Sequence, residues 1–230
     1  MFNRLKEYGT FLGSLMVTNY RLMRGMWKLT KLPQPAITVF GSSRMAFDSK
    51  DGDRACALAK KLTLGGFSVI TGGGPGIMAA ANKGAFEAAK ELRLEYENGD
   101  RKGLPSLGIG LTRLNREKSN PYVHDYIEME HFFARKWLLV RYSVGFVVFP
   151  GGFGTMDELF ELLTLMQTKR MPKYPIVLVD KECWEPVRDI INKQMVAKGL
   201  IGKGDEKLVD LITDDVDEAY EVILECCKCK

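Results

Sequence analysis

A glycine-rich segment at residues 150–155, Pro-Gly-Gly-Phe-Gly-Thr, has the residue types of a phosphate-binding loop. It follows an apolar run at residues 144–149, typical of a strand buried on both faces of a parallel sheet, and a helical pattern continues from Met156. Glycines let a ligand approach the backbone closely, and the N–H groups and dipole at a helix start favour an anion. Thr155 adds a hydroxyl donor. The alternative is a capping box of Thr155 and Glu158, with the glycines serving only a tight turn.

A second glycine-rich segment, Thr-Gly-Gly-Gly-Pro-Gly at residues 71–76, also links a strand pattern to a helical one. It fits either an anion or base site or a helix entry with close backbone packing. Arg135 and Lys136 lie on a largely apolar helical segment. The pair fits a solvated face, or Arg135 could point to the strand-end rim and either bind a phosphate or hold a catalytic carboxylate in place.

Several other chemistries are disfavoured by the sequence. The glycine spacing at residues 71–76 is not that of a dinucleotide-binding turn, and no phosphate-binding Gly-x-x-x-x-Gly-Lys-Ser/Thr motif occurs. His124 and His131 lack a second His or Cys at metal-ligand spacing, so we expect no metal. Nothing resembles a Ser/His/Asp arrangement. Five Cys, three of them at residues 226–229, are too few for a disulfide scaffold and indicate reduced thiols in the cytoplasm rather than a zinc site.

Strand and helix patterns alternate along most of the chain, which indicates an α/β Rossmann-like fold. We predict a doubly wound, mainly parallel sheet with helices on both faces. The strands are expected at residues 36–40, 67–70, 107–111, 126–129, 144–149, 175–179 and, at one edge, 208–212. Helices are expected at 53–64, from 77 to about 92, from 132, at 156–167, 185–198 and 216–226. Ligands bind beyond the carboxyl ends of such strands, which places Ser42, Gly73 and Gly152 along one rim and makes residues 113–122 a functional loop.

We divide the chain into an N-terminal helical extension at residues 1–32 and a single nucleotide-binding domain at residues 33–230. The extension has apolar residues at helical spacing with Arg and Lys between them, which fits packing on the domain, a second subunit, or a membrane surface. Neither a signal peptide nor a run of roughly 18 apolar residues is evident. The net charge of +4 is mild and scattered, so we expect no nucleic-acid partner, and without a long apolar run we expect no membrane partner.

Four motifs together resemble the Lonely Guy family, the cytokinin riboside 5′-monophosphate phosphoribohydrolases that are also filed as possible lysine decarboxylases. They occupy residues 39–44, 71–78, 132–136 and 150–158. The resemblance spans about residues 36–184 and is strongest to the longer bacterial type, which has a similar N-terminal helix. It implies a homodimer or higher homo-oligomer. No pyridoxal-phosphate site is recognisable, and we expect no cofactor.

The resemblance implies hydrolysis of the N-glycosidic bond of AMP or a cytokinin nucleotide, giving a free base and ribose 5-phosphate. It assigns catalysis to Arg135 and Glu158. It assigns phosphate binding to Gly151, Gly152, Gly154 and Thr155. For the rest of the nucleotide we name Gly41, Ser42, Ser43, Gly73, Gly74, Gly76, Met78 and Lys136.

One position departs from the longer type, which commonly has Glu where this chain has Ala79. We expect that Glu to lie near the ribose, so its loss bears on rate and substrate. The alternative function is a non-catalytic carrier of a nucleotide or of molybdenum cofactor.

Overall fold

A seven-stranded parallel sheet forms the centre of the protein, in the strand order β4-β3-β2-β1-β5-β6-β7. The structure is a computed structural model that describes residues 2–33, 35–92, 105–112 and 119–228. The order reverses beside β1, so the loops after β1 and β5 flank a switch point, where α/β sheets bind ligands. The strands are β1 (Ala36–Phe40), β2 (Ser68–Thr71), β3 (Ser106–Leu111), β4 (Asp125–Met129), β5 (Gly145–Val148), β6 (Ile176–Val179) and β7 (Leu211–Thr213).

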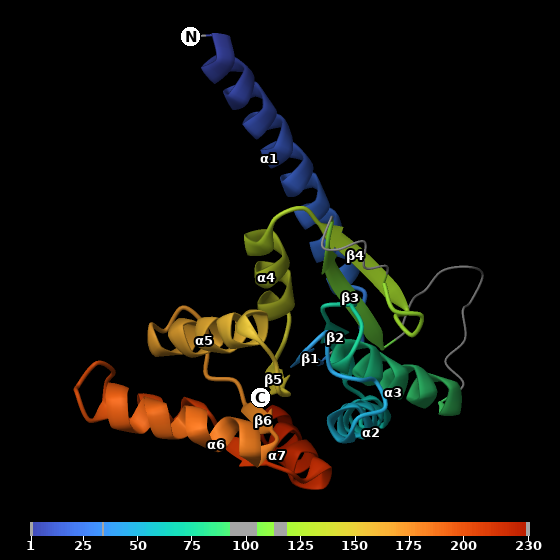
Figure 1. Ribbon diagram of the computed structural model, residues 1–230. Coiled ribbons are helices and arrows are strands. Elements are labelled where there is room, and N and C mark those ends of the chain that lie inside the picture. The colour runs from blue at the N-terminus through green and yellow to red at the C-terminus, as the bar shows by residue number, and fades with distance from the viewer. Residues whose placement is uncertain (1, 34, 93–104, 113–118, 229–230) are drawn as a thin grey trace.

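Helices cover both faces of the sheet (Figure 1). One face carries the end of α1 (Phe2–Leu29), α4 (Phe132–Arg141), α5 (Phe153–Gln167) and α6 (Lys181–Ile190). The other carries α2 (Lys50–Leu64), α3 (Ile77–Glu91) and α7 (Val216–Lys228). The doubly wound Rossmann-like fold expected from the sequence is therefore confirmed.

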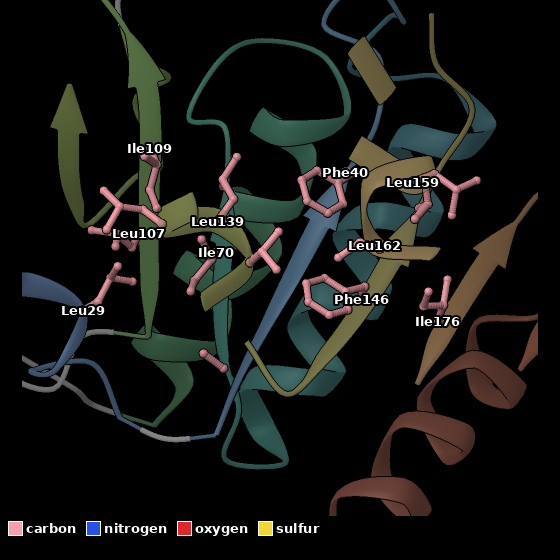
Figure 2. Packing of buried hydrophobic residues seen from close by; sticks show 14 of the residues in the cluster. Leu29, Phe40, Ile70, Leu107, Ile109, Leu139, Phe146, Leu159, Leu162 and Ile176 are labelled. Atoms are coloured by element: carbon pink, nitrogen blue, oxygen red, sulfur yellow. The ribbon is translucent and has the colours of Figure 1, made fainter. Parts of the chain in front are cut away.

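Alternate residues of each central strand enter the two hydrophobic clusters. Phe40 and Phe146 pack under α4 and α5, as Figure 2 shows, with their rings stacked at a centroid distance of 6.3 Å. Ile37, Val39 and Val147 face α2, α3 and α7. Both faces of β1 and β5 are thus buried from solvent, which explains the unbroken apolar runs that predicted these strands.

The helices α2 and α3 pack closely because α3 has a glycine at the contact. A methyl group on Gly84 would overlap the Cys56 carbonyl oxygen and lie 2.9 Å from the Lys60 nitrogen. Since α3 begins directly after the second glycine-rich loop, this packing fixes the position of that loop relative to the sheet.

Several element ends differ from the sequence predictions. α2 begins at Lys50 because the Ser49 side chain accepts a hydrogen bond from the Gly52 N–H and caps it. α5 begins at Phe153, inside the glycine-rich segment. α6 passes into a π-helical segment, Ile191–Val196, and a 3₁₀ turn at Asp205–Leu208 delays the edge strand until Leu211.

α1 projects well beyond the rest of the molecule (Figure 1). Its C-terminal half is anchored by buried Leu29, by Gly25 against Leu138, and by a hydrogen bond from the Lys28 Nζ to Asp125 Oδ1 at 2.6 Å. No helix among the described residues is long and apolar enough to span a membrane.

Replacing Gly84 with Ala should destabilise the protein, because the added methyl group forces α2 and α3 apart. The expected loss in the free energy of unfolding is about 1–3 kcal/mol, the usual cost of overpacking. Urea unfolding measures it. Gly13→Ala is the matched control, since that helical glycine has open space around it; equal losses in the two variants would contradict the explanation.

Candidate active site

Three loops meet at the carboxyl edge of the sheet, and the backbone of one residue joins them. The Ser42 N–H donates to the Pro150 carbonyl at 3.0 Å, and the Ser42 carbonyl accepts from the Ile77 N–H at 3.1 Å. The loop after β1 is therefore bonded both to the loop after β5 and to the start of α3.

Two glycines allow these loops to pack closely against one another and against the start of α5. Gly76 has a φ of +68°, and a side chain there would meet the Ser42 carbonyl oxygen and lie 3.0 Å from the Ser43 carbonyl carbon. A methyl group on Gly151 would overlap the Thr155 hydroxyl. Both positions thus require glycine for packing as well as for any contact with a ligand.

The loops surround a cavity of about 710 Å³. Its volume lies in the range of small-molecule sites, and it opens beside the switch point of the sheet. Its lining contains Gly41, Ser42, Ser43, Arg44, Gly72, Gly74, Met78, Gly110, Leu111, Tyr126, Phe132, Arg135, residues 151–156 and Glu158.

The start of α5 faces this cavity with backbone rather than with a side-chain cap. Gly152 is the N-cap residue, and no side chain makes a capping hydrogen bond there. The first N–H groups of a helix have no acceptor within the helix, and its dipole places positive charge at this end. The capping-box interpretation of Thr155 and Glu158 is therefore wrong, and the N-terminus of α5 is open to an anion.

Arg135 and Glu158 form a largely buried ion pair in the cavity wall. Arg135 Nη1 lies 3.0 Å from Glu158 Oε1, and the side chains are only 15% and 12% exposed. Arg135 Nε also donates to the Ile109 carbonyl at 2.9 Å, so the guanidinium is fixed by β3. Burial raises the pKa of the Glu158 carboxyl above its usual value, and the positive charge of Arg135 opposes this rise.

The second glycine-rich loop is held by a buried polar network. Asn120 Nδ2 donates to the carbonyls of Gly73 and Gly74 and to Asn82 Oδ1, at 3.0–3.1 Å. Thr71 Oγ1 donates to the same Asn82 oxygen at 2.7 Å. The Asn120 carboxamide thus fixes the conformation of this loop from a segment about fifty residues away in the chain.

Most of the residues proposed from the sequence meet in the cavity. The exceptions are Gly73 and Gly76, which shape the second loop behind the lining, and Lys136. The Lys136 Nζ lies 3.0 Å from Asp157 Oδ2 and 3.1 Å from Glu161 Oε2, in a groove on the other side of α4. Because Arg135 and Lys136 are adjacent on a helix, they point in different directions.

Ala79 also lies away from the cavity lining. It is 7% exposed and lines a separate hollow of about 400 Å³ together with Phe47, Pro75 and Tyr122. A Glu at this position would therefore point toward that hollow, and its expected place near the ribose is not supported by the structure.

Sequence reasoning missed several groups at the site. Tyr126, Phe132 and Leu111 line the cavity without belonging to any glycine motif. Asn82 and Asn120 were overlooked because nothing in their spacing shows that they meet. Of the functional loop expected at residues 113–122, residues 113–118 lie outside the described part of the chain.

The fold and the cavity define a Rossmann-like α/β protein with a glycine-rich loop and an uncapped helix start at the switch point of its sheet. Two family models match this chain: the SLOG cluster4 family at residues 34–92, and the family described as possible lysine decarboxylase at residues 78–223. The chain belongs to the possible lysine decarboxylase family, the family that its glycine motifs indicate under the name Lonely Guy.

This chain spans less than a quarter of the length of one similar protein and about half of the length of another. The pyrimidine/purine nucleotide 5′-monophosphate nucleosidase of Escherichia coli strain K12 is 34% identical over 47% of this chain and 23% of that protein. The cytokinin riboside 5′-monophosphate phosphoribohydrolase LOG4 of Arabidopsis thaliana is 27% identical over 57% of this chain and 55% of that protein.

A solved structure shows the same fold. The molybdenum cofactor carrier protein of Chlamydomonas reinhardtii superposes with a TM-score of 0.57 at 21% identity, over 85% of this chain and 99% of that one.

The buried Glu158 should make stability depend on pH. A carboxyl whose pKa is higher in the folded than in the unfolded protein binds more protons when folded, so stability falls as pH rises through the folded pKa. Glu158→Gln lacks this titration. Its unfolding free energy relative to wild type should therefore increase between pH 5 and pH 8 in urea unfolding experiments. Subtracting the unfolding free energy of wild type from that of the variant at each pH cancels the contributions of the other titratable groups. A difference that stays flat or falls with pH would refute the prediction.

Proposed function

We propose that this protein is a nucleoside 5′-monophosphate phosphoribohydrolase, which hydrolyses the N-glycosidic bond of AMP or a cytokinin riboside monophosphate. The observation that carries the proposal is that a largely buried carboxylate, paired with an arginine, lies in the second turn of a helix whose uncapped N-terminus lines the same cavity. The nucleosidase and phosphoribohydrolase names of the similar proteins support the same reaction class.

The phosphate of the substrate would bind at the start of α5. The backbone N–H groups at residues 153–155 and the Thr155 hydroxyl are the donors, and the cavity-lining Gly152 and Gly154 leave room for the phosphate oxygens. This contact is remote from the bond that breaks, so its binding energy holds the ribose in place rather than acting on the leaving base.

Glu158 would act at the anomeric carbon. As the bond from C1′ to the base nitrogen breaks, its electron pair leaves with the base and positive charge develops on the ribose, which the carboxylate stabilises. Glu158 also acts as the general base: it takes a proton from a water molecule, whose oxygen bonds to C1′, and this proton then passes to the leaving nucleobase. The products are the free base and ribose 5-phosphate. Arg135 fixes the position of the carboxylate and favours its ionised form.

Glu158→Gln should abolish release of the base while AMP binding remains. General-base catalysis contributes about 10²–10⁴-fold, so turnover should fall by at least about 100-fold. Chromatography of free base from a panel of monophosphates measures turnover, and calorimetry measures binding. Asp157→Asn is the matched control, because that neighbouring carboxylate points to Lys136 outside the cavity.

Two outcomes would overturn this proposal. One is a wild-type protein that binds AMP and releases no base from any monophosphate, the behaviour of a carrier. The other is full turnover by Glu158→Gln. For an active enzyme, the raised pKa of Glu158 makes turnover fall on acidification at a higher pH than for an ordinary Glu.

We further propose that the protein works as a cytoplasmic homo-oligomer, with residues 1–32 as an interaction segment and residues 33–230 as the nucleotide-binding domain. α1 has a stripe of exposed apolar side chains at helical spacing, opposite the face that packs on the domain: Leu12, Met16, Tyr20, Met23 and Trp27. An apolar groove lies between α4 and α5 and contains exposed Phe133 and Trp137. Contiguous apolar surface of this kind marks interfaces, and a second copy is the occupant we propose.

Two acidic substitutions in the stripe, Met16→Glu together with Met23→Glu, should convert the oligomer to monomers, because buried charge is costly at an interface. Sedimentation equilibrium measures the mass, with the exposed Lys198→Glu as control. Self-association would be contradicted by a wild-type protein that is monomeric in solution, including one that binds vesicles of anionic lipid as a monomer.

A further inference from the structure

Tyr126 lies across three glycines at one end of the cavity. On β4 it pairs with Gly108 of β3, and Gly110, two residues further along, shares the same face of the sheet. Its ring extends over β3 to Gly73 in the loop after β2. One aromatic side chain thus crosses a whole strand.

Each of these glycines leaves room for the ring, and two of them also serve the backbone: Gly73 has a φ of +72°, and a methyl group on Gly108 would lie 2.9 Å from the Gly73 Cα. A methyl group on Gly110 would overlap the tyrosine hydroxyl, one on Gly73 would lie 2.6 Å from Cε2, and one on Gly108 would lie 3.0 Å from Cδ2. Glycine weakens a strand interior, and two within the six residues of β3 have no evident role in the sheet itself. The glycines form a cradle that seats one specific side chain.

The backbone at Tyr126 is also fixed. Its carbonyl accepts a hydrogen bond from the Lys28 Nζ at 3.1 Å, and its N–H donates to Asp125 Oδ1 at 2.8 Å. The ring therefore has a defined place in the cavity wall.

This place lies at the opposite end of the cavity from the start of α5. The phosphate loop follows β5, and the sheet order puts β1 and β2 between β5 and β3. Three strand spacings amount to about 14 Å, the scale of an extended nucleoside monophosphate. With phosphate at α5 and ribose at Glu158, the base would extend toward Tyr126.

We propose that Tyr126 is a specificity-determining residue whose ring stacks on the heteroaromatic base of a bound nucleoside 5′-monophosphate. The inference rests on the proposed function for the orientation of the ligand. The cradle of Gly73, Gly108 and Gly110 holds the ring in the stacking position. Stacking needs only the ring, so the hydroxyl contributes little.

Removal of the ring separates base recognition from phosphate recognition. Tyr126→Leu should raise the KM for AMP about tenfold, as expected for loss of one base-stacking contact. The inhibition constant of ribose 5-phosphate, which has no base, should stay unchanged. Tyr126→Phe keeps the ring and should retain most of the AMP affinity that Tyr126→Leu loses. Tyr220→Leu, a half-buried tyrosine of α7 outside the cavity, controls for a general loss of stability.

Gly110→Ala provides a second, independent variant. Its methyl group displaces the ring, so it should raise the KM for AMP in the wild-type background and have little effect when Tyr126 is already Leu. This non-additivity is the mark of two residues that act through one contact.

The possible failures are distinguishable. If the wild-type protein releases no base, the proposed function fails. The affinities of wild type and Tyr126→Leu for AMP and for ribose 5-phosphate, measured by calorimetry, then test the role of Tyr126. If wild type is active and Tyr126→Leu leaves the KM unchanged, or weakens ribose 5-phosphate equally, base stacking is overturned. A wild type that binds neither molecule overturns both.

Discussion

The two backbone hydrogen bonds of Ser42 are the constraint on which the site depends. They join the loop after β1 to the loop after β5 and to the start of α3, and so fix three segments that are far apart in the chain. Neither bond uses a side chain. The requirement therefore falls on the glycines around them, of which Gly76 must have a positive φ and Gly151 must leave room for Thr155.

The ion pair of Arg135 and Glu158 occupies the space that this framework creates. Burial raises the pKa of the Glu158 carboxyl, the positive charge of Arg135 opposes this rise, and the arginine is itself fixed through the Ile109 carbonyl. Burial of the pair costs stability. Glu158 also lies near the start of a helix, where its negative charge would compete with a bound anion. Such an arrangement is more readily explained by chemistry than by folding.

The parallel sheet and the three strand-end loops could be predicted from the sequence because periodicity and glycine spacing are local properties, whereas the pairing of Arg135 with Glu158 came from the family resemblance. The sequence could not show which of two neighbouring cations enters the cavity, because Lys136 differs from Arg135 in helical phase and that phase depends on the packing of α4. The place near the ribose expected for a Glu at position 79 came from the same resemblance, and Ala79 lies in a separate hollow instead. Asn120 and Tyr126 were missed because their roles follow from contacts with Gly73 and Gly110, which no spacing along the chain reveals.

Thr155 and Glu158 lie three residues apart on α5, and this has a consequence for how the site measures its ligand. Three residues of an α-helix advance by about 4.5 Å, a distance set by backbone geometry rather than by loop conformation. In the proposed reaction, the helix would act as a ruler between the phosphorus atom and the reacting carbon. Changes in the other two loops could then alter which base is accepted while the reach from phosphate to C1′ stays constant.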